Sequence, residues 1–180
     1  MLPELQTERL TLRPAAESDL DALWALWTDP AVRRFLFDDV AVSRERAAEV
    51  LADCRAQMAD GLGLWVILTR DRQRVIGCAG LMPVGMAVQY EPRLAGEVEP
   101  LVALDPALWH QGFATEALAA AIGYAFGPRD LPRLAGVTDI PNEASHRLLL
   151  RLGFEVLGEC DGPTHRMRTY RLMATSRPQH

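Results

Sequence analysis

The stretch LVALDPALWHQGFATEALAAAIGYAF, residues 101–126, joins an apolar segment, a short loop with one glycine and an alanine-rich segment without interruption. The apolar segment, which begins at Val98, is typical of a strand even though Pro100 interrupts it. Apolar residues of the alanine-rich segment recur at helical spacing, and Gly127-Pro128 marks its end. The stretch therefore predicts a strand, a turn at Gly112 and a long helix.

A helix that begins directly after such a turn can bind an anion. Its first backbone N–H groups lack intrahelical partners, and the positive end of the helix dipole lies there. Gly112 would let the backbone approach the anion, Ala114 would keep the next close point small, and Thr115 can donate its hydroxyl. A tight turn before an ordinary helix explains Gly112 equally well. The GxxxxGK[ST] and GxGxxG nucleotide-binding patterns are absent.

The rest of the chain predicts a mixed α/β fold in one domain. The expected helices cover residues 20–27, 47–58, 117–126 and 143–152, and the expected strands cover residues 10–13, 64–68, 75–81, 98–104, 134–137, 154–160 and 166–173. Two helices thus precede the main sheet, the second and third strands form an antiparallel pair, and a parallel crossover follows later. We expect a single domain over 1–180, with a core of about 5–173 and a polar tail over 174–180.

Several boundaries of these helices have recognisable signals. Ser18 is a plausible cap for the first helix, and Asp29-Pro30 is expected to end it. The last helix is expected to begin after Asn142 and to end before Gly153.

Composition and sequence pattern disfavour several classes of function. The net charge of −5 gives no electrostatic reason to expect nucleic acid as a partner. No apolar stretch reaches 18 residues and the start is not a secretory signal, so we expect a cytoplasmic protein without a membrane partner. Three widely spaced cysteines predict free thiols in a reducing compartment, and no Cys/His cluster has metal-ligand spacing. The sequence favours neither a monomer nor a homodimer.

Three segments, in order, resemble the GNAT superfamily of N-acetyltransferases, and within it the branch that includes the ribosomal-protein N-terminal (alanine/serine) acetyltransferases. They are TERLTLRPAAESDLDALWALWTDPAVRRFL, WHQGFATEAL and PNEASHRLLLRLGF. The second is similar to the superfamily pattern Q/R-x-x-G-x-G/A, with Trp109, Gly112 and Ala114 at the specified positions. His110 departs from the glycine that is common in the branch, which makes the loop stiffer.

The resemblance implies a central, mostly antiparallel sheet that is splayed between its fourth and fifth strands, where acetyl-coenzyme A (acetyl-CoA) enters. The backbone of the fourth strand would pair with the pantetheine arm, loop amides would hold the pyrophosphate, and an asparagine would bind the cofactor on its other side. The implied cofactor-binding residues are Val102, Ala103, Leu104, His110, Gln111, Gly112, Phe113, Ala114, Thr115 and Asn142.

Acetyl transfer to an ammonium needs a proton acceptor and a partner for the departing thiolate. Glu97 and Glu99 are expected on the strand that meets the thioester, and we favour Glu99 as the acceptor, although a solvated or structurally paired carboxylate is an equal alternative. Many members of the family use a tyrosine for the thiolate, but Leu149 stands at that position here. Ser145 is the replacement that the branch suggests, and a serine that bonds the start of its own helix is the alternative. His146 is expected to face solvent.

These observations favour an enzyme in which the amine attacks acetyl-CoA directly, since no Ser/His/Asp or Cys/His arrangement is evident. The acceptor is a protein N-terminus or a small-molecule amine, and Glu91, Glu97 and Glu99 favour a cationic one. A non-catalytic acyl-CoA sensor is the alternative, supported by the missing tyrosine. A doubly wound nucleotide-binding domain is disfavoured because the glycine loop lies far from the first strand.

Overall fold

The computed structural model describes residues 1–71 and 74–174, and it divides into two compact units. One unit comprises Met1–Met82 with Pro100–Ala121, and the other comprises Pro83–Glu99 with the chain from Ile122 onward. The chain passes from one unit to the other within two strands and one helix. Residues 175–180 of the expected polar tail lie outside the described residues.

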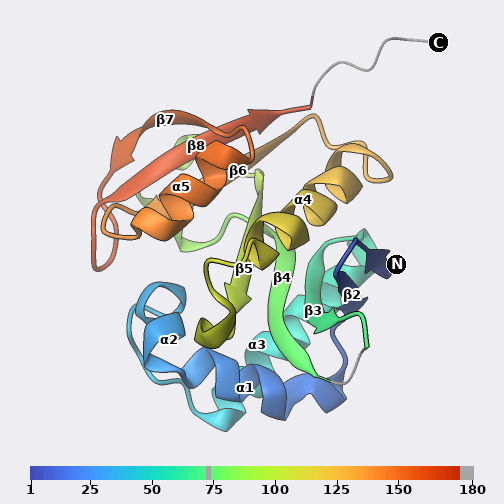
Figure 1. Cartoon of the computed structure of the whole chain (residues 1–180). Coiled ribbons are helices and arrows are strands. Elements are labelled where there is room, and N and C mark those ends of the chain that lie inside the picture. The colour runs from blue at the N-terminus through green and yellow to red at the C-terminus, as the bar shows by residue number, and fades with distance from the viewer. Residues whose placement is uncertain (72–73, 175–180) are drawn as a thin grey trace, which may run out of the picture. The chain divides into compact units, whose positions relative to one another are not determined.

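The first unit contains most of a five-stranded sheet (Figure 1). In spatial order its strands are β1 (Leu5–Gln6), β2 (Leu10–Pro14), β3 (Gly63–Thr69), β4 (Val75–Pro83) and β5 (Val98–Leu104). The pairs from β1 to β4 are antiparallel, with Leu12 opposite Ile67 and Val66 opposite Cys78. The expected antiparallel pair of strands, now β3 and β4, is therefore confirmed.

Three helices pack against this sheet, where the sequence predicted two: α1 (Leu20–Thr28), α2 (Pro30–Leu36) and α3 (Arg44–Ala56). Alternate residues of β3 (Leu64, Val66 and Leu68) join side chains from all three helices in one hydrophobic core. The prediction of two helices was wrong because Asp29-Pro30 begins α2 as well as ending α1. The Asp29 carboxylate accepts a hydrogen bond from the Ala31 N–H at 2.8 Å, and Pro30 takes the first helical position.

The N-terminal boundary of α1 also differs from the prediction. Ser18 lies inside a short 3-10 turn, η1 (Glu17–Asp19), and does not cap the helix. Asp19 precedes α1 instead. Its buried carboxylate accepts a hydrogen bond from the Ala16 N–H at 2.7 Å and pairs with the Arg13 guanidinium at 2.7 Å. The ion pair joins the end of β2 to the start of α1.

The second unit is built on a three-stranded sheet in the order β6 (Arg133–Asp139), β8 (Met167–Met173), β7 (Glu155–Cys160). Both outer strands are antiparallel to β8 and hence parallel to each other, so the link through α5 (Glu143–Arg151) is the parallel crossover that the sequence predicted. Leu149 of α5 lies over one face of this sheet, at Gly136. The segment that precedes β5 contains two short 3-10 helices, η3 (Met86–Gln89) and η4 (Pro92–Leu94). From this segment, Val84 and Leu94 pack with Ala135 of β6.

The break expected between the fourth and fifth predicted strands is confirmed at the level of topology. Those strands are β5, the last strand of the five-stranded sheet, and β6, an outer strand of the other sheet. The long helix α4 (Phe113–Phe126) connects them in sequence and ends directly before Gly127-Pro128, as predicted.

Candidate active site

The glycine loop makes a left-handed turn directly before a long helix. After η5 (Pro106–Leu108), His110 adopts φ = 62° and Gly112 adopts φ = 83°, and α4 begins at Phe113. Both φ values lie in the left-handed region, which favours glycine. His110 therefore adopts a backbone conformation typical of the glycine that it replaces, at some conformational cost. The 14 residues of α4 place a helix N-terminus directly after the loop.

Arg9 holds this loop from the opening segment of the chain, a role that the sequence did not reveal. Its Nε pairs with Glu116 Oε2 of α4 at 2.6 Å, and its Nη1 donates to the Gln111 carbonyl at 3.0 Å. The guanidinium also lies 4.4 Å from the centre of the Phe113 ring. Glu116 in turn accepts hydrogen bonds from the Arg9 N–H and the Thr7 hydroxyl. The loop and the first turn of α4 are thereby anchored to one cation.

The space beside Gly112 is occupied by the same guanidinium. A Cβ added to Gly112 would lie 3.3 Å from Arg9 Nη2, and its φ of 83° would strain any other residue. Among the described residues, Nη2 has no hydrogen-bond partner. A positive charge with unused donors therefore lies beside the turn, an arrangement that suits a phosphate group.

Strand β5 has an edge that can accept an extended ligand. It is the last strand of its sheet within the described part of the chain, so one edge has no strand partner there. The residues expected to pair with pantetheine, Val102–Leu104, form the end of this strand, and the side chains of Ala103 and Leu104 are buried. The Leu104 carbonyl already accepts a hydrogen bond from Trp109 Nε1 at 2.9 Å, which ties the strand to the loop.

The two acidic candidates near the start of β5 have different environments. Glu97 lies before the strand rather than on it, and its buried carboxylate accepts from Arg133 Nε at 2.7 and 3.0 Å. Glu97 is therefore a structural ion-pair partner. Glu99 lies on β5 and is half-buried, and burial raises the pKa of its carboxyl from 4.5 to about 7, an effect that the Gly85 N–H partly offsets. This pKa suits a proton acceptor near neutral pH.

Glu91, which was expected to help attract a cationic acceptor, is also paired. The Arg93 guanidinium and backbone N–H bond its carboxylate and lower its pKa to about 2. Of the three carboxylates that suggested a cationic acceptor, only Glu99 lacks an ion-pair partner among the described residues. The electrostatic preference is therefore weaker than the sequence indicated.

The start of α5 brings Asn142 and Ser145 into direct contact. Asn142 Oδ1 accepts the Ser145 N–H at 3.2 Å, so its side chain caps the helix as predicted. Its amide nitrogen has no acceptor within the described part of the chain. The Ser145 hydroxyl has no hydrogen-bond partner among the described residues, so the predicted alternative of a serine bonding its own helix start is not observed.

His146 does not face solvent, contrary to the prediction. It is half-buried, and its Nδ1 lies 2.9 Å from the hydroxyl of Tyr170, a fully buried residue of β8. The same hydroxyl lies 3.1 Å from Thr138 Oγ1 of β6. This network fixes the first turn of α5 to its sheet.

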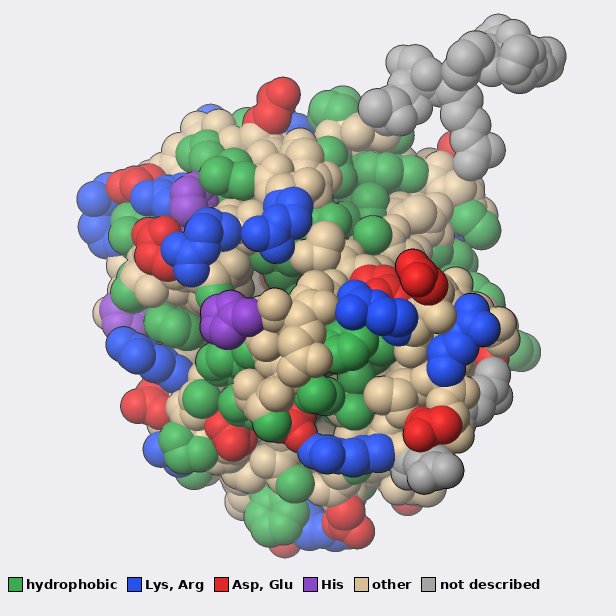
Figure 2. Space-filling model, viewed as in Figure 1, with side chains coloured by type: hydrophobic (Ala, Val, Ile, Leu, Met, Phe, Trp, Pro, Cys, Tyr) green, Lys and Arg blue, Asp and Glu red, His purple; other side chains and the backbone are tan. Residues whose placement is uncertain are grey.

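Other features of the described residues concern the surface charges, the cysteines, metal ligands and membrane spans. Figure 2 shows both basic and acidic side chains at the surface. Cys54, Cys78 and Cys160 are free thiols, as predicted. Within residues 1–71 and 74–174, no group of three or more His, Cys, Asp or Glu side chains is arranged to hold a metal ion. In the same residues, no helix has the length and apolar character needed to cross a membrane.

Comparison with known proteins identifies the family. Residues 9–155 match the model of the acetyltransferase (GNAT) domain. The uncharacterized N-acetyltransferase YoaA of Bacillus subtilis (strain 168) is 32% identical over 159 residues, which cover 88% of this chain and 86% of that protein.

Solved structures share the fold at lower identity. A GNAT-family acetyltransferase from Bordetella pertussis has a TM-score of 0.81 at 22% identity, covering 94% of this chain and 98% of that one. The ribosomal L7/L12 α-N-protein acetyltransferase RimL in complex with coenzyme A has a TM-score of 0.77 at 18% identity, covering 95% and 98%. The family model over residues 9–155 and the relative with 32% identity show that the chain belongs to the GNAT family of acetyltransferases, and the solved structures share its fold.

Proposed function

We propose that this protein transfers the acetyl group of acetyl-CoA to a primary amine by direct attack of the amine on the thioester. The observation that carries the proposal is the left-handed turn at His110 and Gly112, anchored by Arg9 at the N-terminus of α4. Membership of the acetyltransferase family supports the same chemistry. The family match runs through both compact units, and we propose that they act as one domain.

The residues of the first unit fit the cofactor. Backbone N–H groups from His110 to Thr115 would hold the pyrophosphate with Arg9 Nη2 as an additional donor, and the free edge of Val102–Leu104 would pair with the pantetheine arm. Asn142, whose amide nitrogen has no partner among the described residues, is a further proposed donor to the cofactor. Acetyl-CoA supplies the activated acetyl group, and the solved complex of RimL with coenzyme A is a relative in fold that binds the same carrier.

We assign removal of the amine proton to Glu99 and stabilisation of the departing thiolate to Ser145. Glu99, with its raised pKa, would accept the amine proton directly or through water, and the Ser145 hydroxyl would donate a hydrogen bond to the departing thiolate. The acceptor class stays broad, because Glu91 and Glu97 are paired. Another fold relative, from Salmonella typhimurium, is described as modifying the N-terminal serine of ribosomal protein L7/L12, so peptide α-amines belong in the first panel.

The decisive experiment follows thiol release from acetyl-CoA across peptides, polyamines and amino acids, with mass spectrometry of the products. Amine-dependent release supports the enzyme, whereas cofactor binding without turnover on any amine would support the sensor instead. Rapid quenching in the absence of amine should trap no acetyl-enzyme. The chain contains no lysine, so an acetyl group found on a lysine side chain belongs to the acceptor.

Removing the Arg9 side chain is expected to weaken acetyl-CoA binding. Arg9→Ala deletes the ion pair to Glu116, the bond to the Gln111 carbonyl and the charge beside Gly112, so we expect about tenfold weaker affinity by calorimetry. Arg44→Ala removes an exposed arginine paired with Asp21 and serves as the control. Equal affinity of Arg9→Ala and the control would show that Arg9 does not support the cofactor.

Ser145→Ala is expected to lower turnover by about tenfold at every pH between 6 and 9. A serine hydroxyl does not titrate in this range, so only its hydrogen bond to the thiolate is lost. Cofactor affinity should stay unchanged, and Ser145→Thr should restore part of the rate. Wild-type turnover in Ser145→Ala would remove the residue from the mechanism.

A further inference from the structure

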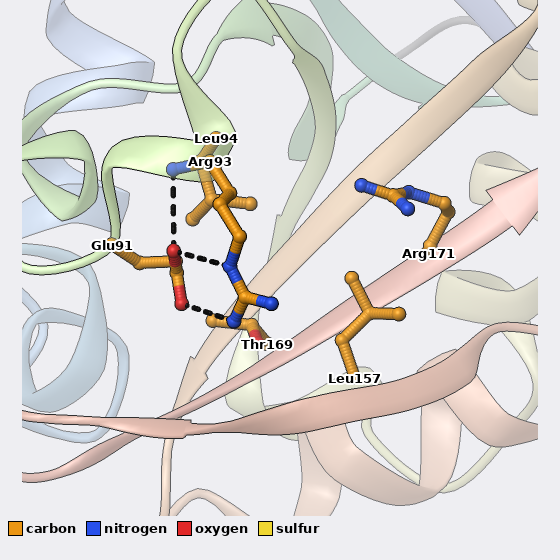
Figure 3. Close-up of a pocket in the computed structure, with 6 residues that line it drawn as sticks. All are labelled: Glu91, Arg93, Leu94, Leu157, Thr169 and Arg171. Carbon is orange, nitrogen blue, oxygen red and sulfur yellow. Dashed lines mark hydrogen bonds and ion pairs between the residues drawn. The ribbon is translucent and has the colours of Figure 1, made fainter.

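The second unit contains a small cavity. None of the residues that line it takes part in the proposed acetyl transfer. Its volume is about 110 Å³, enough for several water molecules or one small organic molecule. The lining comes from the segment around η4 and from strands β7 and β8. It consists of Glu91, Arg93, Leu94, Leu157, Thr169 and Arg171 (Figure 3).

Two guanidinium groups point into this cavity from opposite sides (Figure 3). Arg93 donates from Nε and Nη2 to the Glu91 carboxylate at 2.8 and 2.7 Å, which leaves Nη1 without a partner among the described residues. The Arg171 side chain has no hydrogen-bond or ion-pair partner in the same residues, although Glu155 lies opposite it in the strand register. Both guanidinium groups therefore keep unused donors at the cavity, although the Arg93 side chain is 75% exposed and its charge is already paired with Glu91. An anion in the cavity could accept hydrogen bonds from both of them.

The charges that line the cavity limit the charge of that anion. The cavity lining contains two arginines and one glutamate, so its net charge is +1. The Glu91 carboxylate would repel a second negative charge on the bound anion. A planar carboxylate matches the fork of a guanidinium in two parallel hydrogen bonds. A monoanionic carboxylate therefore fits better than a phosphate dianion.

Two leucines give the cavity part of an apolar wall. Leu94 is buried and closes one side, while Leu157 of β7 is 42% exposed and leaves an aliphatic surface at the cavity. The Thr169 hydroxyl donates to the Gly158 carbonyl at 3.3 Å, so the hydroxyl proton is not available to the anion. A ligand with a short aliphatic chain would cover Leu157 while its carboxylate meets the two arginines.

We propose that this cavity binds a small aliphatic monocarboxylate, held by Arg93 and Arg171 with its chain against Leu157. The proposal does not depend on acetyl transfer, because none of the six lining residues takes part in the proposed reaction. It adds a second ligand site to the chain, for a compound of the size of butyrate.

The test is a titration of the full ¹⁵N-labelled chain with butyrate, followed by backbone NMR without acetyl-CoA. Saturable shifts are expected at Arg93, Leu157 and Arg171. Butyramide, which has the same shape without the charge, should bind at least about tenfold more weakly, and so should inorganic phosphate. Tighter binding of phosphate than of butyrate, or equal binding of butyramide, would overturn the proposal.

A matched pair of variants tests whether Arg171 holds the butyrate carboxylate. Arg171→Gln should weaken butyrate binding by about tenfold or more, because it removes one of the two cations. Arg147→Gln removes an equal charge from an exposed position of α5 and should bind butyrate as the wild type does. Leu157→Ser should weaken butyrate more than acetate. Retained butyrate affinity in a folded Arg171→Gln protein, or shifts confined to other residues, would also overturn the proposal.

Discussion

Replacing Glu99 with glutamine is expected to lower kcat/KM by about 100-fold at pH 7, the scale of a lost general base. With Glu99 in place, the rate should rise with pH through about 7 as its carboxyl ionises. The loss in Glu99→Gln should shrink toward high pH, where more of the amine is already free. Thiol release measured from pH 6 to 9 gives the pH dependence of the rate for the wild type and for Glu99→Gln. Glu155→Gln removes an equal charge from an exposed position of β7 and serves as the control.

The same variant has an expected effect on stability with a definite sign. Between about pH 4.5 and 7 the folded protein holds the Glu99 proton and the unfolded chain does not, so the free energy of unfolding falls as the pH rises through this window. Glutamine removes that dependence. We expect Glu99→Gln to be more stable than the wild type by about 1–3 kcal/mol above pH 7, and to lose the advantage near pH 4.5. Denaturant unfolding at both pH values measures it.

A combination of results would contradict the role of Glu99. If Glu99→Gln lost rate uniformly across the pH range, the carboxylate would serve structure or acceptor binding rather than proton transfer. If its stability equalled that of the wild type at pH 7, the carboxyl would not be desolvated in solution.

Gly112→Asp is expected to weaken acetyl-CoA binding by at least about 100-fold while the fold persists. Three effects combine: aspartate is strained at φ = 83°, its carboxylate would repel the pyrophosphate, and it would neutralise the Arg9 guanidinium, which lies 3.3 Å from the added Cβ. Calorimetry with acetyl-CoA measures the loss, and circular dichroism checks the fold.

Two companion variants separate these effects. Gly112→Ala introduces the strain and the contact without the charge, so its loss should be clearly smaller than that of Gly112→Asp. His110→Gly relieves a left-handed φ of 62° two residues earlier and should keep full affinity. Unchanged affinity in a folded Gly112→Asp protein would mean that the loop does not hold the pyrophosphate.

Local sequence patterns predicted the features that depend on neighbouring residues. Periodicity located α3, α4, α5 and the main strands, because each buries one face, and Asn142 and Gly153 marked the ends of α5. The Asp29-Pro30 signal was interpreted only as a stop, although aspartate followed by proline also starts helices, so α2 was missed. The two-residue strand β1 was missed because it is too short to show alternation.

Contacts between distant segments were beyond the reach of these patterns. Arg9 and Glu116 lie 107 residues apart, and His146 meets Tyr170 across 24 residues, so no local spacing announces either pair. Glu97 and Glu99 look equivalent in the sequence. The structure separates them, because Glu97 forms an ion pair with Arg133 and Glu99 is left as the candidate proton acceptor.

The strand order β6-β8-β7 has a consequence for folding during synthesis. The central strand is the last of the three to leave the ribosome, so β6 and β7 emerge before the strand that pairs with both of them. Until then each exposes unpaired backbone groups, and β7 also carries exposed Val156 and Leu157. A pause in translation between β7 and β8 would prolong this exposure, and a chain cut short there would keep two unpaired strands that can associate with other chains.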